Sequence, residues 1–161
     1  MDIGLAYFSQ EKFMSQDLTA SEQALEVLKQ RGLGALADRM GIKLVELSAE
    51  RAVATMPVEG NTQPIGILHG GAHVVLAESL GSFAANVHAH PWGYAVGIEI
   101  NASHHSSVKS GIVTGTCVAI KLGKTLTTHE VKITDESGNL LSTVRITNFL
   151  RPKPPSGQAD Q

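Results

Sequence analysis

One carboxylate stands alone in the middle of this 161-residue sequence. Between Glu59 and Glu99 the only Asp, Glu, Lys or Arg is Glu78, and it lies in an apolar stretch that runs from His69 to Asn86. A carboxylate in apolar surroundings is costly to keep ionised, so such a group is usually neutralised, paired or catalytic. Glu78 is therefore a candidate nucleophile or general base, and the alternative is a structural carboxylate held by neighbouring donors.

The residues just before Glu78 could supply the other half of such a reaction. Gly70 and Gly71 open a predicted helix, and the first N–H groups of a helix are free to bind an anion or a developing oxyanion. Gln63 and His69 could add side-chain donors or order the loop before the helix. A carboxylate and an oxyanion site together are sufficient for acyl transfer, and this pattern favours that chemistry.

Spacing along the helix limits how the site can be assembled. Seven residues take the chain from Gly71 to Glu78, which is roughly 10 Å along a helix axis. A reacting carbonyl must lie within about 3 Å of its oxyanion donors, with the attacking group equally near. Two antiparallel helices related by a two-fold axis can meet this condition where one chain cannot. We therefore predict a homo-oligomer whose active sites each use Glu78 of one chain and Gly70 and Gly71 of the other.

The periodicity of the rest of the sequence predicts the elements that must position these groups. Apolar residues on nearly every side predict a buried helix from about residue 70 to 88, and alternation predicts strands over 42–47, 52–58, 94–104, 111–122, 126–135 and 140–150. A capping box at Thr19 and Glu22 begins an N-terminal helix, and a second short helix is predicted over 33–40. One sheet must curl around the central helix, so the fold class is α+β. We expect a flexible arm over 1–17, a single domain over 18–151 and a disordered tail over 152–161.

Composition excludes several classes of function. The net charge is −2 with no block of like charges, so neither nucleic acid nor a membrane is an expected partner. A single cysteine, Cys117, allows no internal disulfide and is predicted to lie in the core. His69 and His73 are four residues apart, as metal ligands on a helix can be, but no third ligand stands at a diagnostic spacing, so no metal is expected. No signal peptide is visible, and a cytoplasmic protein is expected.

The motif around Glu78 resembles that of a known enzyme family. The stretch from Gly66 to Ser82, GILHGGAHVVLAESLGS, closely resembles the PaaI-like branch of the acyl-CoA thioesterases with the hotdog fold. It is most similar to the 1,4-dihydroxy-2-naphthoyl-CoA hydrolase and 4-hydroxybenzoyl-CoA thioesterase group, as are residues 96–104, 121–124 and the closing strand. The resemblance covers about residues 38–152. It implies a long helix wrapped by an antiparallel sheet, dimers that often pair into tetramers, and hydrolysis of an aromatic or medium-chain acyl-CoA to free acid and CoA.

The resemblance also implies roles for individual residues. Glu78 would attack the thioester or activate a water, the Gly70 N–H would bind the oxyanion, and Gln63 and His69 would assist. Further substrate contacts would come from Gly71, from Ser82 near the nucleophilic water, from Gly97 and His104 along the acyl and pantetheine path, and from Lys121, Gly123 and Lys124 near the nucleotide phosphates. Relatives can carry an arginine shortly after the histidine that matches His104, whereas this chain has His105-Ser106-Ser107. No cofactor is implied beyond the coenzyme A of the substrate.

Two other functions remain open from the sequence. The same fold carries hydratases and dehydratases of acyl thioesters, but these resemble a different motif with a catalytic His and Asp or Glu, which is not found in this sequence. A non-catalytic acyl-CoA-binding protein is the third possibility, and it would bind ligand without turnover.

Overall fold

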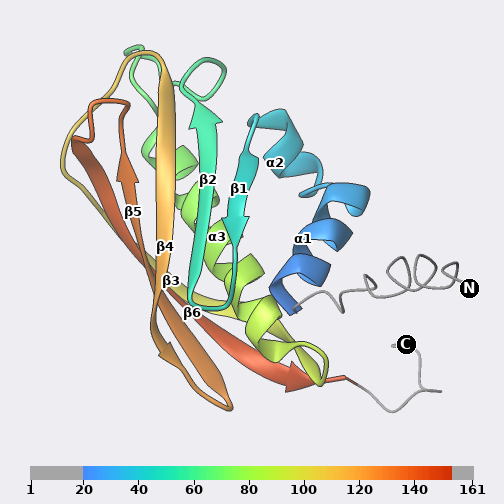
Figure 1. Cartoon of the computed structure of the whole chain (residues 1–161). Coiled ribbons are helices and arrows are strands. Elements are labelled where there is room, and N and C mark those ends of the chain that lie inside the picture. The colour runs from blue at the N-terminus through green and yellow to red at the C-terminus, as the bar shows by residue number, and fades with distance from the viewer. Residues whose placement is uncertain (1–19, 154–161) are drawn as a thin grey trace, which may run out of the picture.

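The computed structural model describes residues 20–153 and consists of one long helix packed against a curved sheet, with two helices at one side (Figure 1). The helices are α1 (Ala20–Arg31), α2 (Ala35–Arg39) and α3 (Gly70–Ala89). The strands are β1 (Lys43–Leu47), β2 (Arg51–Pro57), β3 (Gly93–His104), β4 (Ile112–Leu122), β5 (Leu126–Thr134) and β6 (Leu140–Pro152). The predicted α+β class and its order of elements are confirmed. The predicted arm and Thr19 lie outside the described residues, as does most of the predicted tail, and β6 continues one residue past the expected domain end.

The six strands form one antiparallel sheet in the order β1-β2-β4-β5-β6-β3. In β5 the residues Thr127, His129, Val131 and Ile133 are buried, and those between them are more accessible. Because successive side chains of a strand point to opposite faces, one face of the sheet packs on α3 and the other faces outward. Cys117 is buried in β4 as predicted, and burial raises the pKa of its thiol to about 12.

Small residues let α3 approach the sheet closely. A Cβ atom on Gly81 of α3 would overlap the side chain of Ile146 in β6. A Cβ on Gly115 of β4 would lie 2.8 Å from Leu80 on the same helix. The helix and the sheet are therefore held in a narrow range of relative positions, and the residues at the two ends of α3 meet defined partners on the strands.

The two edges of the sheet differ. The β1 edge has α1 beside it, and α1 also packs against α3 (Figure 1). At the other edge, β3 pairs with β6 on one side, and no strand within residues 20–153 pairs with its other side. Val96 and Ile98 on this strand are 42% and 58% exposed. A long free edge with apolar side chains is a surface that another strand can pair with.

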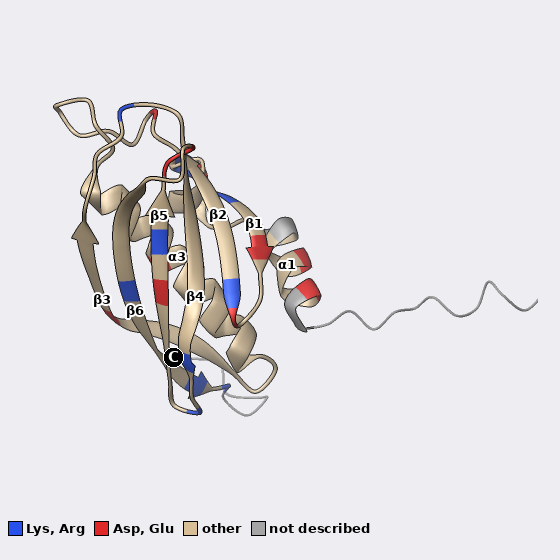
Figure 2. Ribbon diagram, turned by 60° about the vertical axis from the view of Figure 1, so that its left-hand side comes forward, with Lys and Arg blue, Asp and Glu red and all other residues tan. Residues whose placement is uncertain are grey.

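Charged side chains are spread over the molecule. In Figure 2 single Lys or Arg segments lie on β2, β5 and β6, and Asp or Glu segments lie on β1, β5 and α1. None of the helices within residues 20–153 is long and apolar enough to span a membrane.

Candidate active site

The start of α3 is organised by His69, which precedes the helix in an extended conformation with φ −69° and ψ 133°. Its Nδ1 accepts a hydrogen bond of 2.8 Å from the Gly71 N–H, and its carbonyl accepts one of 2.9 Å from the Ala72 N–H. The Gly70 N–H finds no acceptor within residues 20–153. Of the two glycines, Gly70 is thus the one that keeps a free donor for a ligand. These two bonds fit the loop-ordering interpretation of His69, and its part in the reaction stays a prediction.

The loop before α3 folds back on itself and carries Gln63 near the helix start. The Gln63 N–H donates to the Ile67 carbonyl at 2.9 Å, and the His69 N–H donates to the Asn61 carbonyl at 2.9 Å. The Asn61 side-chain amide in turn donates to the carbonyls of Met40 and Pro57, both at 2.9 Å. These bonds hold the loop against the ends of α2 and β2, so the backbone at Gln63 and His69 is fixed in position.

His104, at the end of β3, packs against the first glycine of α3. A Cβ atom on Gly70 would lie only 2.9 Å from His104 Nε2, so glycine is what allows the imidazole to stand there. The other ring nitrogen, Nδ1, lies 2.8 Å from Ser142 Oγ on β6. The structure thus places His104 beside Gly70, and His69 beside Gly71, at the start of α3.

Glu78 lies in a second group of residues farther along α3. A Cβ atom on Gly97 of β3 would lie 2.8 Å from Glu78 Oε1, so the carboxylate rests against a strand position that only glycine leaves open. Half-buried Ser82 stands one turn further along, and its Oγ lies 3.5 Å from Asn148 Oδ1. No hydrogen bond or ion pair within residues 20–153 engages the Glu78 carboxylate. It is neither capped nor paired, which argues against the structural alternative for this residue.

These two groups are separate in one chain. Eight residues take α3 from Gly70 to Glu78, so the free N–H and the carboxylate stand about 12 Å apart along the helix axis. We call Gly70, His69 and His104 the donor half-site, and Glu78, Ser82 and Gly97 the carboxylate half-site. A single thioester carbonyl cannot touch both halves of the same chain.

The predicted nucleotide contacts lie elsewhere. Gly123 sits in the tight turn between β4 and β5, and its carbonyl is 2.9 Å from Nε2 of His88 near the end of α3. Lys121 and Lys124 on this turn are exposed. A cavity of about 390 Å³ opens beside the turn, lined by His88, Trp92, Leu122, Gly123 and Lys124. Within one chain this cavity and the donor half-site are at opposite ends of the helix.

Three residues near these half-sites were not predicted to take part. His73, considered from the sequence only as a metal ligand, is buried and hydrogen-bonded to Ser142, and Asn148 faces Ser82. Ser142 and Asn148 share strand parity with the buried Val144 and Ile146, which was a signal that they point inward. Within residues 20–153 no group of three or more His, Cys, Asp or Glu side chains could hold a metal ion.

A long helix packed against a six-stranded antiparallel sheet is the hotdog fold of the thioester hydrolases. Residues 65–142 match the model of the Thioesterase superfamily, and the chain belongs to this family. It is 40% identical over 127 residues to the 1,4-dihydroxy-2-naphthoyl-CoA hydrolase of Escherichia coli, covering 78% of this chain and 93% of that protein. It is 41% identical over 124 residues to a proofreading thioesterase of Cronobacter turicensis, covering 76% of this chain and 90% of that protein. The crystal structure of a thioesterase of Haemophilus influenzae superposes with a TM-score of 0.76 at 32% identity, covering 83% and 94% of the two chains.

Proposed function

We propose that this thioester hydrolase acts on an aromatic or medium-chain acyl-CoA in the cytoplasm and releases the free acid and CoA. The observation that carries the proposal is the pair of half-sites on α3, a free N–H at Gly70 and an unpaired carboxylate at Glu78. Two similar proteins, from Escherichia coli and Listeria monocytogenes, are named 1,4-dihydroxy-2-naphthoyl-CoA hydrolase, and their named acyl group is aromatic.

In the proposed reaction the thioester carbonyl oxygen accepts a hydrogen bond from the Gly70 N–H. Glu78 either takes a proton from a water that attacks the carbonyl carbon, or attacks that carbon itself to form an acyl-carboxylate anhydride that water then cleaves. In both routes the carbon–sulfur bond breaks and CoA leaves as the thiol, with its proton derived from water. Ser82, one turn from Glu78, is positioned to hold the water or the acyl group.

The proposed site is completed by a second copy of the chain. Pairing of two β3 strands about a two-fold axis would extend the sheet through its free edge and cover Val96 and Ile98. The two α3 helices would then run antiparallel beside each other, so that the donor half-site of each chain faces the carboxylate half-site of its partner. Two such dimers could pair further into a tetramer, as the resemblance implies.

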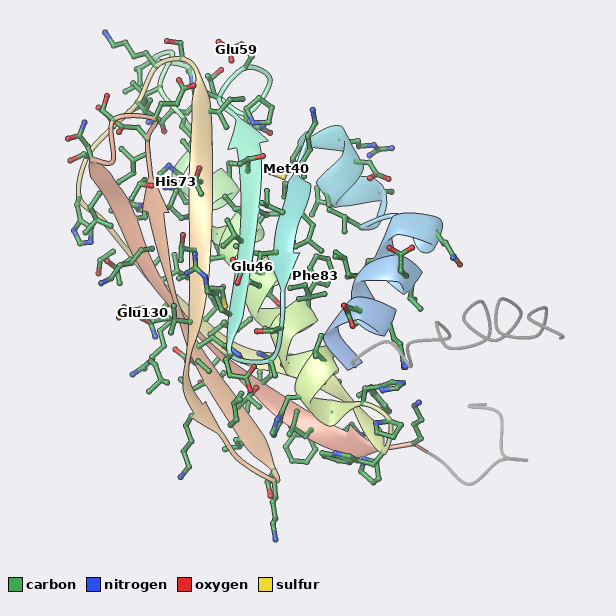
Figure 3. All side chains as sticks on the ribbon, in the orientation of Figure 1. Met40, Glu46, Glu59, His73, Phe83 and Glu130 are labelled. Atoms are coloured by element: carbon green, nitrogen blue, oxygen red, sulfur yellow. The ribbon has the colours of Figure 1, made fainter. Side chains whose placement is uncertain are left out.

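Release of free thiol from a panel of aromatic, short-chain and long-chain acyl-CoAs tests the proposal. Glu78→Gln keeps the size of the side chain but removes its basicity, so kcat should fall about 10³-fold while the protein stays folded and dimeric. Glu130→Gln is the matched control, because Glu130 (labelled in Figure 3) alternates with the buried residues of β5 and lies near Lys132 on the outward face of the sheet. This variant should change kcat less than about twofold. Near-normal thiol release by the Glu78 variant would refute the proposal. A hydroxyacyl thioester formed without thiol would indicate a hydratase, and tight binding without turnover would indicate a binding protein.

A further inference from the structure

Behind the donor half-site, three side chains form a continuous line of hydrogen bonds. Ser142 Oγ lies 2.6 Å from His73 Nδ1 and 2.8 Å from His104 Nδ1. The two imidazole rings meet edge to face, with centroids 5.3 Å apart and planes at 80°. His104 Nε2, the nitrogen that takes no part in this line, is the one beside Gly70.

Burial changes along this line. His73 is 3% exposed and Ser142 is 0% exposed, whereas His104 is accessible. Burial, together with electrostatic repulsion between the two imidazole groups of His73 and His104, lowers the pKa of His73 to about 4, so His73 is neutral near pH 7. Figure 3 labels His73 on the side of α3 that faces the strands. A polar group in such a position costs free energy unless it is hydrogen-bonded, and these two buried groups satisfy each other.

A count of protons links the states of the two histidines. The Ser142 hydroxyl has one proton and can donate to only one imidazole nitrogen at a time. If it donates to His104 Nδ1, His73 donates from its own Nδ1, and neutral His104 carries its proton on Nε2. If it donates to His73 Nδ1, His104 donates to the hydroxyl from Nδ1. Because neutral His73 must adopt one of its two tautomers, Ser142 transmits that choice to the nitrogen of His104 that faces Gly70.

We propose that His73 and Ser142 are positioning residues that hold the His104 ring and its tautomer, so that Nε2 forms a hydrogen bond to the acyl-CoA bound at Gly70. This inference rests on the proposed thioesterase function. It adds an account of which residues fix the orientation of the His104 ring at the donor half-site. A ring held only by packing at an exposed strand end would sample several orientations. Two hydrogen-bonded neighbours that are themselves buried restrict it to one, which is how a site is pre-organised before substrate arrives.

A double-mutant cycle on kcat/KM tests the positioning role. Ser142→Ala removes the central hydroxyl and should lower kcat/KM about tenfold, and His104→Ala should lower it at least as much. In the His104→Ala background, Ser142→Ala should then change kcat/KM less than about twofold, because the group through which it acts is gone. The same tenfold loss in both backgrounds would mean that Ser142 serves only the core, and would overturn the proposal.

Two variants at His73 test the same proposal independently, so that it can be tested even if Ser142→Ala does not fold. Asparagine places a polar atom close to the position of imidazole Nδ1, whereas leucine does not, and the two side chains have similar size. His73→Asn should therefore retain most of kcat/KM, and His73→Leu should match Ser142→Ala. Equal losses in the two His73 variants would contradict a role for the hydrogen bond.

The ring nitrogen signals of His104 provide a readout that needs no turnover. In long-range ¹H–¹⁵N spectra of the full chain, His104 should show one tautomer at neutral pH, and Ser142→Ala should shift its signals toward a mixture. Unchanged His104 signals in Ser142→Ala would refute the positioning role of Ser142, even if the wild-type protein hydrolyses acyl-CoA normally. A wild-type protein that releases no thiol from any acyl-CoA would instead refute the proposed function, whatever the spectra show.

Discussion

The start of α3 and its middle each contribute half of the candidate site, but their polar groups are held differently. In the donor half-site the His69 ring binds the Gly71 N–H, and His104 is bound through Ser142 to buried His73. In the carboxylate half-site Glu78 has no hydrogen-bond partner within residues 20–153 and rests against the bare backbone of Gly97. A donor that stabilises charge works best when it is fixed in advance, whereas a base or nucleophile must keep its lone pairs free for the reaction. The contrast therefore matches the two tasks.

Within the donor half-site, the largest effect is expected when the Gly70 N–H itself is deleted. Gly70→Pro removes the free N–H at the first position of the helix, where proline is well tolerated, and His69 already has the extended conformation that a following proline requires. Loss of one oxyanion donor should lower kcat about 10²- to 10³-fold. Gly70→Ala is the matched control, since its Cβ presses on His104 Nε2 in the same way but the N–H remains. If the two variants have equal kcat, the N–H is not the oxyanion donor.

Mixing two inactive variants tests whether the half-sites of different chains work together. In a dimer of one Glu78→Gln chain and one Gly70→Pro chain, one site carries both defects and the other carries none. Random exchange makes half of the dimers mixed, so activity should recover to about a quarter of the wild-type value, from about a hundredth or less before mixing. Thiol release after co-refolding of equal amounts measures this. No recovery, although mass spectrometry detects mixed dimers, would mean that each site uses one chain only.

The two half-sites also differ in how much of each could be predicted from the sequence. Glu78 was found because a lone charge in an apolar helix is visible in the sequence itself, and the helices and strands follow from periods of 3.6 and 2. The line from His73 to His104 was not found, although His73 shares a helix face with the buried Leu76 and Leu80. Periodicity indicates that a residue is buried but not which residue it meets, and Ser142 lies 69 positions away from His73. The second contact, between Ser142 and His104, depends on the register of β6 against β3, which the sequence pattern leaves undetermined.

The smallest expected effect is on the pH dependence of the free energy of unfolding, and it arises from His73 behind the donor half-site. His73 has a pKa of about 4 when folded against an ordinary value of 6.5, so between these values the unfolded chain binds more protons at this residue than the folded chain does. The free energy of unfolding therefore falls as the pH falls from 6.5 toward 4, by at most about 1.4 kcal/mol per pH unit for one histidine. His73→Asn keeps a polar neighbour for Ser142 but cannot titrate, so its stability should fall less steeply over the same range. Buried His129, whose pKa is also lowered by burial, contributes equally to both proteins.

Urea unfolding at fixed protein concentration between pH 7 and pH 4.5 measures the difference in slope between the wild type and His73→Asn. Parallel curves would mean that His73 is protonated as readily in the folded protein as in the unfolded chain. In that event a charged His73 would donate from Nδ1 to Ser142, and the line of hydrogen bonds behind the donor half-site would not depend on a neutral His73.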